Sequence, residues 1–475
     1  MSARRFGTQS LVRLLGNWQE SNSRTPLWRQ LAEALRLLIL DGRLTLQTRL
    51  PGERELAAAL NVSRTTIASA LGQLREEGFL HSRQGSGSRI VLPERPADLP
   101  PPSATPSTIN LSTAALSAGP EVHQAFQHAM TLLPPYLTQT GYDQQGLPVL
   151  REAIARRYSE RGLPTRPDEV MVVNGALSAF ALILRLFTGP GDRVVIDAPT
   201  YPMAISAIQG ASCRPVGVAL PQQGWDCDGL AATIAQTAPR LAWLMPDFHN
   251  PTGRCMDAPT RQRVADIAAR TRTTLVIDET MVDLWYNAPP PPPLACFNPD
   301  AAVITIGSAG KSFWGGTAHR LDPRQRANDR LADSGPRLSG PGYAAAGAVG
   351  LQLAAGKRAT LLPPRREMLQ ARRDMCEVLM KEYFPRWRFT PPEGGLSFWV
   401  ELPDMLATLF SARAESQGIH IGTGTRFGLE GAFDRYLRLP FTLPDEALRQ
   451  AFSTLQPLWH SLAEQRENTR LRKII

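Results

Sequence analysis

The spacing of apolar residues changes twice along this chain of 475 residues. Across residues 26–77, apolar side chains recur every three or four positions, a period that predicts amphipathic helices. From residue 109 onward, short apolar runs rich in β-branched residues alternate with helical stretches, which predicts an α/β domain with a mainly parallel sheet. The residues between, 93–108, are rich in proline and small polar side chains and predict an extended linker. We therefore expect an N-terminal domain of residues 1–92, this linker, and a large domain of residues 109–475.

The N-terminal part predicts several helices followed by a hairpin. Residues 26–40 have leucines on one helical face, and residues 51–60 form a second amphipathic pattern. After a two-residue turn, Ser63 is a good N-cap for a third helix over residues 64–77. Residues 79–91 predict two short strands around a Gly/Ser tip. Helix, turn, capped helix and hairpin together are typical of a winged helix-turn-helix.

Charge is concentrated at the same end of the chain. The net charge is +9, and residues 1–95 contain 14 Arg against 8 acidic residues, a balance of 14 − 8 = +6. Such an excess indicates an anionic partner, above all nucleic acid, although the charge alone favours a solvated basic face. The first turn of the capped helix, which enters the major groove in this motif, carries Ser63, Arg64, Thr65 and Thr66. Charge, cap and hairpin together favour DNA binding.

Composition narrows the class of protein. The chain is 43% hydrophobic and 20% charged, which is typical of a globular protein. No apolar run reaches the roughly 18 residues that a membrane helix needs, and no secretory signal follows Met1. The five cysteines are scattered without metal-binding spacing. We therefore expect a cytoplasmic protein with neither a metal site nor a membrane partner.

Polar residues follow each strand predicted for the large domain. The strands are expected at residues 170–173, 194–196, 241–245, 275–277 and 303–306. The polar groups that follow them, in the same order, are Asn174 to Ser178, Asp197 to Pro202, His249 to Gly253, Asp278 with Glu279, and Ser308 with Lys311. Each motif alone is weak, and a buried Asp after a strand is usually structural. Because parallel sheets bind ligands at the carboxyl ends of their strands, five such groups in chain order predict a ligand site.

Lys311 is the candidate for covalent chemistry. It follows the strand of residues 303–306 and a turn of small residues, with Ser308 three positions earlier. The chain has only four lysines, and charged helical sequence or the terminal tail holds the other three, Lys357, Lys381 and Lys473. A lysine amine that a strand delivers beside a hydroxyl and backbone N–H groups suits a Schiff base to a phosphorylated aldehyde cofactor.

The N-terminal pattern resembles the winged helix of GntR-type transcription factors over roughly residues 24–92. The segments that carry the resemblance are residues 50–60, 62–66, 74–80 and 84–87. By that similarity, DNA would be contacted by Arg54, Ser63, Arg64, Thr65, Thr66 and Gly85.

The large domain resembles a fold-type I pyridoxal-phosphate aminotransferase over almost all of residues 109–460. By similarity, Lys311 would bind the cofactor covalently, Asp278 would pair with its pyridine nitrogen, and Asn250 would donate to its phenolate oxygen. Tyr201 would stack on the ring, and the phosphate would be held by Ala176, Leu177 and Ser308. Arg438 matches the arginine that takes a substrate carboxylate as a bidentate pair.

The whole arrangement is similar to the MocR family of bacterial regulators. Members typically bind pyridoxal phosphate, form head-to-tail homodimers and respond to the cofactor or to an amino compound. The resemblance therefore implies a transcriptional regulator that senses its ligand. Two alternatives stay open: a working aminotransferase with an accessory DNA-binding domain, and a pseudo-enzyme that uses only protein contacts.

One departure from the family concerns a tyrosine. Relatives often have Tyr three residues after the Asp that pairs with the pyridine, whereas this chain has Met281 there. Tyr286 is the nearest tyrosine downstream, and we do not expect it to reach the cofactor.

A larger departure follows Gly316. Relatives continue with a strand such as Leu-Arg-Ile-Gly-Trp, whose Arg binds the cofactor phosphate, but residues 317–330 contain almost no apolar side chains. Back-translated with permitted codons and read from the second base, the same stretch encodes Leu-Arg-Ile-Gly-Trp-Ile-Arg-Ala-Ser-Glu-Arg-Thr-Ile. We favour a frameshift, either a sequencing error or a compensated mutation, over true divergence, with the frame returning near Leu331. As written, Ala318 replaces the phosphate Arg and Arg320 lies two residues too far along. The sequence predicts cofactor binding weakened by about 1.5–3 kcal/mol, the value of a charge-assisted contact.

Overall fold

The computed structural model describes most of the chain, and every structural statement below concerns that part. The described residues are 6–16, 18–19, 25–40, 44, 48–83, 87–91, 108–118, 122, 125, 129–138, 140–141, 143–315 and 358–471. Four features expected from the sequence lie outside these residues: the linker up to residue 107, Gly85, Lys357 with Lys473, and the segment 317–330. The chain divides into two compact units, one of Met1–Leu111, Leu402–Leu437 and Thr454–Ile475 and the other of Ser112–Glu401 and Arg438–Ser453.

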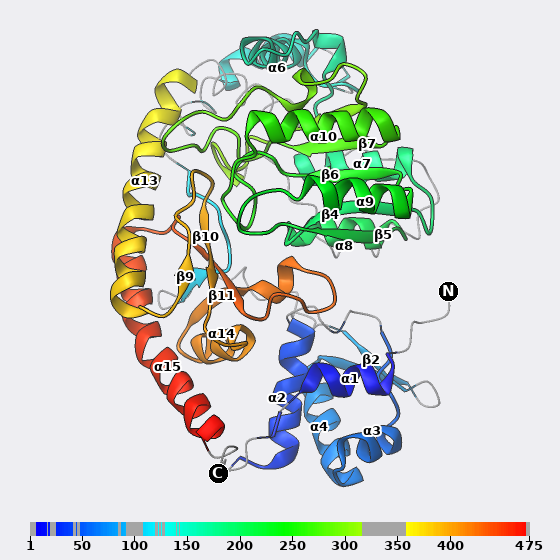
Figure 1. Cartoon of the computed structure of the whole chain (residues 1–475), viewed down its shortest axis with the longest axis vertical. Helices are drawn as coiled ribbons and strands as arrows, with labels where there is room; N and C mark the ends of the chain where they lie inside the picture. Colours follow the sequence, from blue (N-terminus) through cyan, green and yellow to red (C-terminus); the bar gives the residue numbers. More distant parts are fainter. Residues whose placement is uncertain are drawn as a thin grey trace. The chain divides into compact units, whose positions relative to one another are not determined.

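The N-terminal domain is a helical bundle with a hairpin, as the sequence predicts (Figure 1). Its elements are α1 (Thr8–Leu15), α2 (Leu27–Leu40), α3 (Glu53–Leu60), α4 (Arg64–Glu76), β1 (Leu80–Arg83) and β2 (Gly87–Ile90). β1 and β2 pair antiparallel, with Leu80 opposite Ile90. Helix α1 was not predicted, because it has only eight residues and no side-chain N-cap, so the sequence shows little helical periodicity there.

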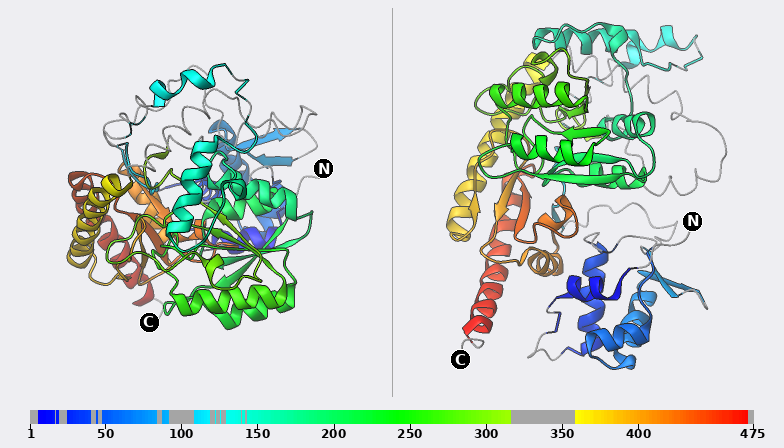
Figure 2. Two further views of the ribbon diagram at one scale, coloured as in Figure 1. Left: turned by 90° about the horizontal axis from the view of Figure 1, so that it is seen from above. Right: turned by 45° about the vertical axis from the view of Figure 1, so that its right-hand side comes forward.

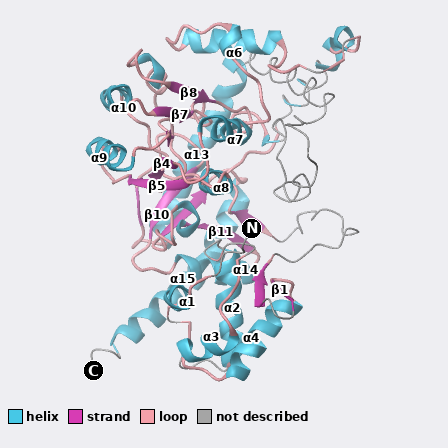
Figure 3. Cartoon of the chain, turned by 90° about the vertical axis from the view of Figure 1, so that its right-hand side faces the viewer, coloured by secondary structure: helices cyan, strands magenta, loops and turns pink. Residues whose placement is uncertain are grey.

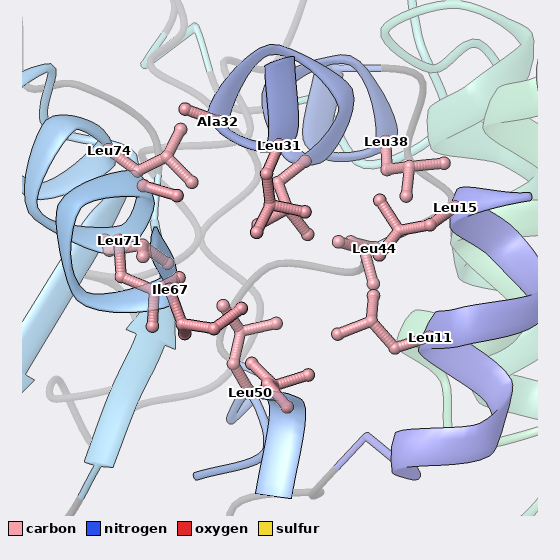
Figure 4. Close-up of a cluster of buried hydrophobic side chains, with 14 of the residues drawn as sticks. Leu11, Leu15, Leu31, Ala32, Leu38, Leu44, Leu50, Ile67, Leu71 and Leu74 are labelled. Atoms are coloured by element: carbon pink, nitrogen blue, oxygen red, sulfur yellow. The ribbon is translucent and has the colours of Figure 1, made fainter. Parts of the chain in front are cut away.

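Leucines from several elements form the core of this domain (Figure 4). Leu11 and Leu15, one helical turn apart on α1, pack into the same cluster as Leu31 of α2 and Leu71 of α4. Ile67, Leu71 and Leu74, which the sequence placed on the inner face of α4, are all buried. The apolar face of each helix is thus covered, and its polar face remains available to a partner.

A five-stranded parallel sheet forms the centre of the large domain. Its order is β5-β4-β6-β7-β8, with all adjacent strands parallel. The bounds are β4 (Arg193–Ala198), β5 (Arg214–Ala219), β6 (Leu241–Leu244), β7 (Thr274–Asp278) and β8 (Val303–Ile306). Helices α7 (Ala176–Phe187) and α8 (Pro202–Gly210) cover one face, and α9 (Cys227–Thr237) and α10 (Ala258–Thr271) cover the other (Figure 3).

Four of the five strands expected from apolar runs are confirmed, as β4, β6, β7 and β8. The fifth expectation, a strand at residues 170–173, is wrong, because these residues belong to no strand. A strand needs a neighbour to satisfy its backbone groups. Here Val172 N–H instead donates to the Gln145 carbonyl, and β8 is the edge of the sheet among the described residues.

A second sheet of five strands was not predicted. Its order is β3-β11-β12-β10-β9, with bounds β3 (Ile109–Leu111), β9 (Arg388–Phe389), β10 (Ser397–Glu401), β11 (Ile419–Thr423) and β12 (Tyr436–Pro440). β3 and β11 pair in parallel although some 300 residues separate them, a pairing that local periodicity does not reveal.

The remaining helices include three long ones. They are α6 (Pro148–Glu160), α13 (Arg358–Tyr383, yellow in Figure 2) and α15 (Asp445–Leu471). The shorter elements are α14 (Ala407–Ser416), η1 (Pro134–Tyr136), η2 (Pro167–Glu169), η3 (Leu294–Cys296) and η6 (Gly424–Phe427). No helix within the described ranges is long and apolar enough to cross a membrane.

Candidate functional site

The carboxyl ends of the parallel strands bring two of the predicted residues together. Asp278 is the last residue of β7 and pairs in register with Ile306, the last residue of β8. Lys311 follows β8 by five residues, so its side chain starts from the same edge of the sheet. This is the edge at which parallel sheets bind ligands.

Asp278 is a buried carboxyl group close to the Lys311 amine. Only 4% of the residue is exposed, and Thr280 N–H donates to its Oδ1 at 2.8 Å. Burial raises the pKa of Asp278, while the hydrogen bonds from Thr280 and the charge of Lys311 lower it. A buried acid of this kind is stabilised by a cationic partner, such as a protonated ring nitrogen.

Lys311 and Arg438 both donate hydrogen bonds to one short stretch of backbone. Lys311 Nζ donates to the Ala114 carbonyl at 2.6 Å, and the Arg438 guanidinium donates to the Ser112 carbonyl. Arg438 lies in β12 and is buried. The structure therefore brings the predicted covalent lysine and the predicted carboxylate-binding arginine to carbonyls two residues apart, directly after β3.

Among the buried polar atoms without a hydrogen-bond partner in the described structure, two lie in the segments that follow β4 and β6. They are the Asn250 amide oxygen, in a residue 9% exposed, and the hydroxyl of Thr200, which is fully buried. A buried polar atom without a partner is costly, and such atoms are often satisfied by a ligand. Together with the acid of Asp278 and the amine of Lys311, this set of donors and acceptors fits a polar ring such as pyridoxal phosphate.

The start of α7 and Ser308, both predicted to hold phosphate, line the same cavity. Gly175, at φ 83°, is the N-cap of α7, so Ala176 and Leu177 open that helix with their N–H groups. Ser308 lies at the end of β8, where its hydroxyl accepts from Gly310 N–H at 3.1 Å. Gly175 and Ser308 both line a cavity of about 1040 Å³ that continues along β8. Tyr201, the predicted stacking residue, is half-buried and is the N-cap of α8.

A buried contact between Asp197 and His249 was not predicted. Both residues were noted at strand ends, yet their contact depends on Trp225, whose Nε1 donates to Asp197 at 3.1 Å. His249 Nε2 lies 3.6 Å from Asp197 Oδ2, a distance that would suit an ion pair. Burial raises the pKa of Asp197 to about 7 and lowers that of His249 to about 3, so the imidazole is neutral at neutral pH. The contact is therefore a packed polar cluster beside Asn250 rather than an ion pair.

Tyr286 does not replace the missing tyrosine. Its buried hydroxyl donates to the Gly395 carbonyl, and burial raises the pKa of its hydroxyl. Met281, at the position of the family tyrosine, is buried too. The hydroxyl that relatives often have near the cofactor is thus absent from position 281.

The candidate DNA-binding residues cluster at the start of α4. Ser63 caps this helix, because its Oγ accepts from Thr66 N–H at 3.0 Å, and it also lies 2.7 Å from Thr65 Oγ1. Arg54 and Arg64 are exposed on the starts of α3 and α4. An exposed helix start with adjacent cations suits a phosphate or base contact.

Two family models cover nearly all of the chain. Aminotransferase class I and II matches residues 108–455, and bacterial regulatory proteins of the gntR family match residues 27–90.

Similar full-length proteins include regulators and an enzyme. The uncharacterized HTH-type transcriptional regulator YisV of Bacillus subtilis is 25% identical over 81% of this chain and 86% of its own. The probable rhizopine catabolism regulatory protein MocR of Rhizobium meliloti is 27% identical over 61% of this chain and 63% of its own. The 2-aminoadipate transaminase of Thermus thermophilus is 28% identical over 63% and 77%.

Solved structures agree on the fold. LysN, the α-aminoadipate aminotransferase of Thermus thermophilus, superposes with a TM-score of 0.65 at 22% identity, covering 76% of this chain and 94% of LysN. The multiple substrate aminotransferase of Thermococcus profundus gives the same TM-score at 24% identity, covering 76% and 93%. The chain therefore belongs to the aminotransferase class I and II family and carries, at its N-terminal end, a DNA-binding domain of the gntR family of bacterial regulators.

Proposed function

We propose that this protein is a ligand-responsive transcriptional regulator. Residues 1–92 would bind double-stranded DNA, residues 93–108 would link the domains, and residues 109–475 would bind pyridoxal phosphate and sense it or an amino compound. The observation that carries the proposal is the pair of hydrogen bonds from Lys311 and Arg438 to Ala114 and Ser112. Ser112 and Ala114 lie four and six residues beyond the linker in the sequence. A ligand that engages Lys311 or Arg438 would therefore break a hydrogen bond to the backbone that continues into the linker.

The residues at the strand ends support the cofactor half of the proposal. Lys311 would hold pyridoxal phosphate covalently, with Asp278 facing the ring nitrogen and Asn250 the phenolate oxygen. Tyr201 would lie against the ring, and the phosphate would be held by Ala176, Leu177 and Ser308. When bound, the cofactor supplies an electron-withdrawing ring and an aldehyde carbon that reacts with amines. Asp278 would keep a proton on the ring nitrogen, because its own buried carboxylate needs a cationic partner.

Arg438 supports an effector with a carboxylate. A guanidinium binds a carboxylate through two parallel charge-assisted hydrogen bonds, which are about twice as strong as bonds to a neutral carbonyl. An acidic amino compound would therefore draw Arg438 away from Ser112, and cofactor capture would draw Lys311 away from Ala114. Both events would release the same segment, which gives a physical route from ligand to linker.

The start of α4 supports the DNA half. Arg54, Arg64, Thr65 and Thr66 would contact the duplex together with Ser63 and Gly85, as in other winged helices. Such proteins bind two-fold operators as dimers, so we also propose a homodimer. We place the protein in the cytoplasm, where reduced cysteines and a DNA partner are found together.

The test is a DNA-binding titration with and without ligand. Duplexes selected from a random pool by the full-length protein would be followed by fluorescence anisotropy across a range of salt concentrations. We expect added pyridoxal phosphate, alone or with an amino acid, to change the affinity of the unaltered protein and of a Lys381→Ala control, at an exposed lysine. Lys311→Ala should bind the same DNA but lose the response. DNA affinity that is identical with and without ligand would contradict the proposal.

A working aminotransferase is the second candidate. It is favoured by the presence of Lys311, Asp278, Asn250 and Arg438 in one domain. The charge of Lys311 also lowers the pKa of Asp278. Turnover of an amino acid with a keto acid, lost in Lys311→Ala, would support the enzyme. Ligand-dependent DNA binding without turnover would support the regulator alone.

A further inference from the structure

The end of helix α6 is joined to the segment that follows Asp278 by two partly buried ion pairs. Arg157 lies in the last turn of α6, and Arg161 is the C-cap of that helix. Arg157 Nη2 lies 3.0 Å from Asp283 Oδ2, and Arg161 pairs with Glu279. The side chains of Asp283 and Glu279 are only 5% and 1% exposed. Ion pairs with buried carboxylates restrain their side chains more strongly than surface ion pairs do, because water screens their attraction little.

Asp283 connects this helix to the segment that carries Lys311. The oxygen that receives Arg157, Oδ2, also accepts a hydrogen bond from the Ser312 hydroxyl at 3.3 Å. Ser312 is the residue next to Lys311 and is 1% exposed. The backbone carbonyl of Asp283 accepts from Arg366 of α13 at 2.7 Å. One residue thus joins α6, α13 and the turn after β8.

Glu279, the partner of Arg161, also connects the ends of β7 and β8. Glu279 follows Asp278 directly, and its N–H donates to the Ile306 carbonyl at the end of β8 at 2.8 Å. The two ion pairs therefore fix both the residue after Asp278 and the residue after Lys311. A lysine has four rotatable side-chain bonds, so the direction of its amine depends on how firmly its backbone is held.

We propose that Asp283, held by Arg157, is a positioning residue for Lys311 through its hydrogen bond from Ser312. That Lys311 binds the cofactor rests on the proposed function, whereas its positioning by Asp283 does not. With the Asp283 carboxylate in place, the turn is fixed and the Lys311 amine stays at its 2.6 Å contact with Ala114. Without it, the turn is free to move and the amine is more often exposed to water.

The first test is chemical labelling of lysine amines in the full-length protein without cofactor. With only four lysines, mass spectrometry resolves each labelling rate after brief treatment with acetic anhydride. We expect Asp283→Asn and Ser312→Ala to label Lys311 about five to ten times faster than the unaltered protein, as befits the loss of one buried hydrogen bond. Lys381, which is exposed and pairs with Glu377 on α13, should label at an unchanged rate.

Two controls separate positioning from a loss of stability. Ser312→Thr keeps the hydroxyl and should keep the slow Lys311 labelling. Asp168→Asn removes an ion pair with Arg166 in the same domain, but these side chains are 72% and 73% exposed and should have no effect. Thermal melts would confirm that each variant is folded at the labelling temperature. If Asp283→Asn is not folded, Ser312→Ala decides.

A second readout uses the cofactor. With pyridoxal phosphate added, the pH midpoint of the Lys311-dependent visible band should shift by about half a pH unit or more in Asp283→Asn and Ser312→Ala, because the surroundings of the amine change. Unchanged Lys311 labelling and an unchanged midpoint in folded Asp283→Asn and Ser312→Ala would overturn the positioning role. DNA binding that ignores ligand, with faster labelling in these variants, would instead overturn the proposed function and leave the positioning role standing.

Discussion

The start of α4 and the carboxyl edge of the large sheet place polar side chains in opposite environments. At α4, Arg64 and Thr65 are exposed, and a leucine core beneath them provides the stability. At the sheet edge, Asp278 is almost fully buried, and burial raises its pKa. An exposed face works by Coulomb attraction and geometry, and salt screens it. A buried site works through desolvation, which makes each acid depend on a specific partner.

Mutations in the two regions should therefore have different effects. Changes on the exposed face should alter binding to DNA while leaving the fold intact, because surface residues carry little of the free energy of unfolding. Changes at the buried edge should alter ligand binding and the pH dependence of stability together. The four predictions below test this separation, from the largest effect to the smallest.

Removal of the Lys311 amine should have the largest effect. Lys311→Ala is expected to abolish the visible band that forms with pyridoxal phosphate, since no other lysine follows a strand of the buried sheet. DNA affinity measured without ligand should shift toward the value that the unaltered protein shows with ligand, because Lys311→Ala also removes the hydrogen bond to the Ala114 carbonyl. A visible spectrum and an anisotropy titration on the same preparation measure both. A band that survives in Lys311→Ala would assign the covalent role to another amine.

The two regions also differ in how much the sequence predicted. The N-terminal domain follows from local signals: leucine spacing, the Ser63 cap and a Gly/Ser tip each specify their own element. Ser63, Asp278 and Lys311 were singled out from such signals, since Ser63 caps α4, Asp278 ends β7 and Lys311 follows β8 by five residues. The contacts among Asp197, Trp225 and His249, and those among Arg157, Asp283 and Ser312, join residues from 28 to 126 positions apart along the chain. No local pattern encodes such partners.

The strand expected at residues 170–173 shows the same limit. Apolar β-branched sequence specifies a preference for extended backbone, and Val170 has that conformation, at φ −111° and ψ 128°. A strand also requires a partner ladder, which is a property of the whole sheet. The second sheet was missed for the complementary reason, because its strands are short and β3 pairs with the distant β11.

A cavity in the helical core should destabilise the N-terminal domain alone. Leu71 is 1% exposed in the cluster that joins α1, α2 and α4, so Leu71→Ala is expected to cost about 2–5 kcal/mol of unfolding free energy. Leu27→Ala, at a residue 38% exposed on α2, is the matched control and should cost about 0.5 kcal/mol or less. Calorimetry would show an early transition for Leu71→Ala. The Lys311-dependent band should persist, and its loss would contradict the separation between the regions.

The buried Asp197 and His249 should give opposing dependences of stability on pH. The pKa of Asp197 is raised from 3.8 to about 7, so the folded state binds more protons and stability falls as pH rises between these values. The pKa of His249 is lowered from 6.5 to about 3, so stability rises with pH across that interval. Each slope is at most about 1.4 kcal/mol per pH unit, and the two largely cancel between pH 4 and 6.5.

Single substitutions should expose each slope. Asp197→Asn should leave a stability that rises with pH up to about 6.5, and His249→Gln one that falls from about pH 4 to 7. Urea unfolding at several pH values, followed by a probe in the large domain, measures both. Parallel pH profiles for the two variants and the unaltered protein would show that neither group titrates differently on folding.

Ser63 gives the smallest effect and the finest test, because its hydroxyl both caps α4 and is a predicted DNA contact. Ser63→Ala removes the acceptor for Thr66 N–H and should destabilise α4 by about 1 kcal/mol, seen as faster hydrogen exchange in that helix. Ser63→Asn keeps a side-chain cap and should restore the exchange rates. If Ser63→Asn also restores DNA affinity, the residue acts on DNA only by holding the helix. If affinity stays low, the serine hydroxyl itself contacts the DNA.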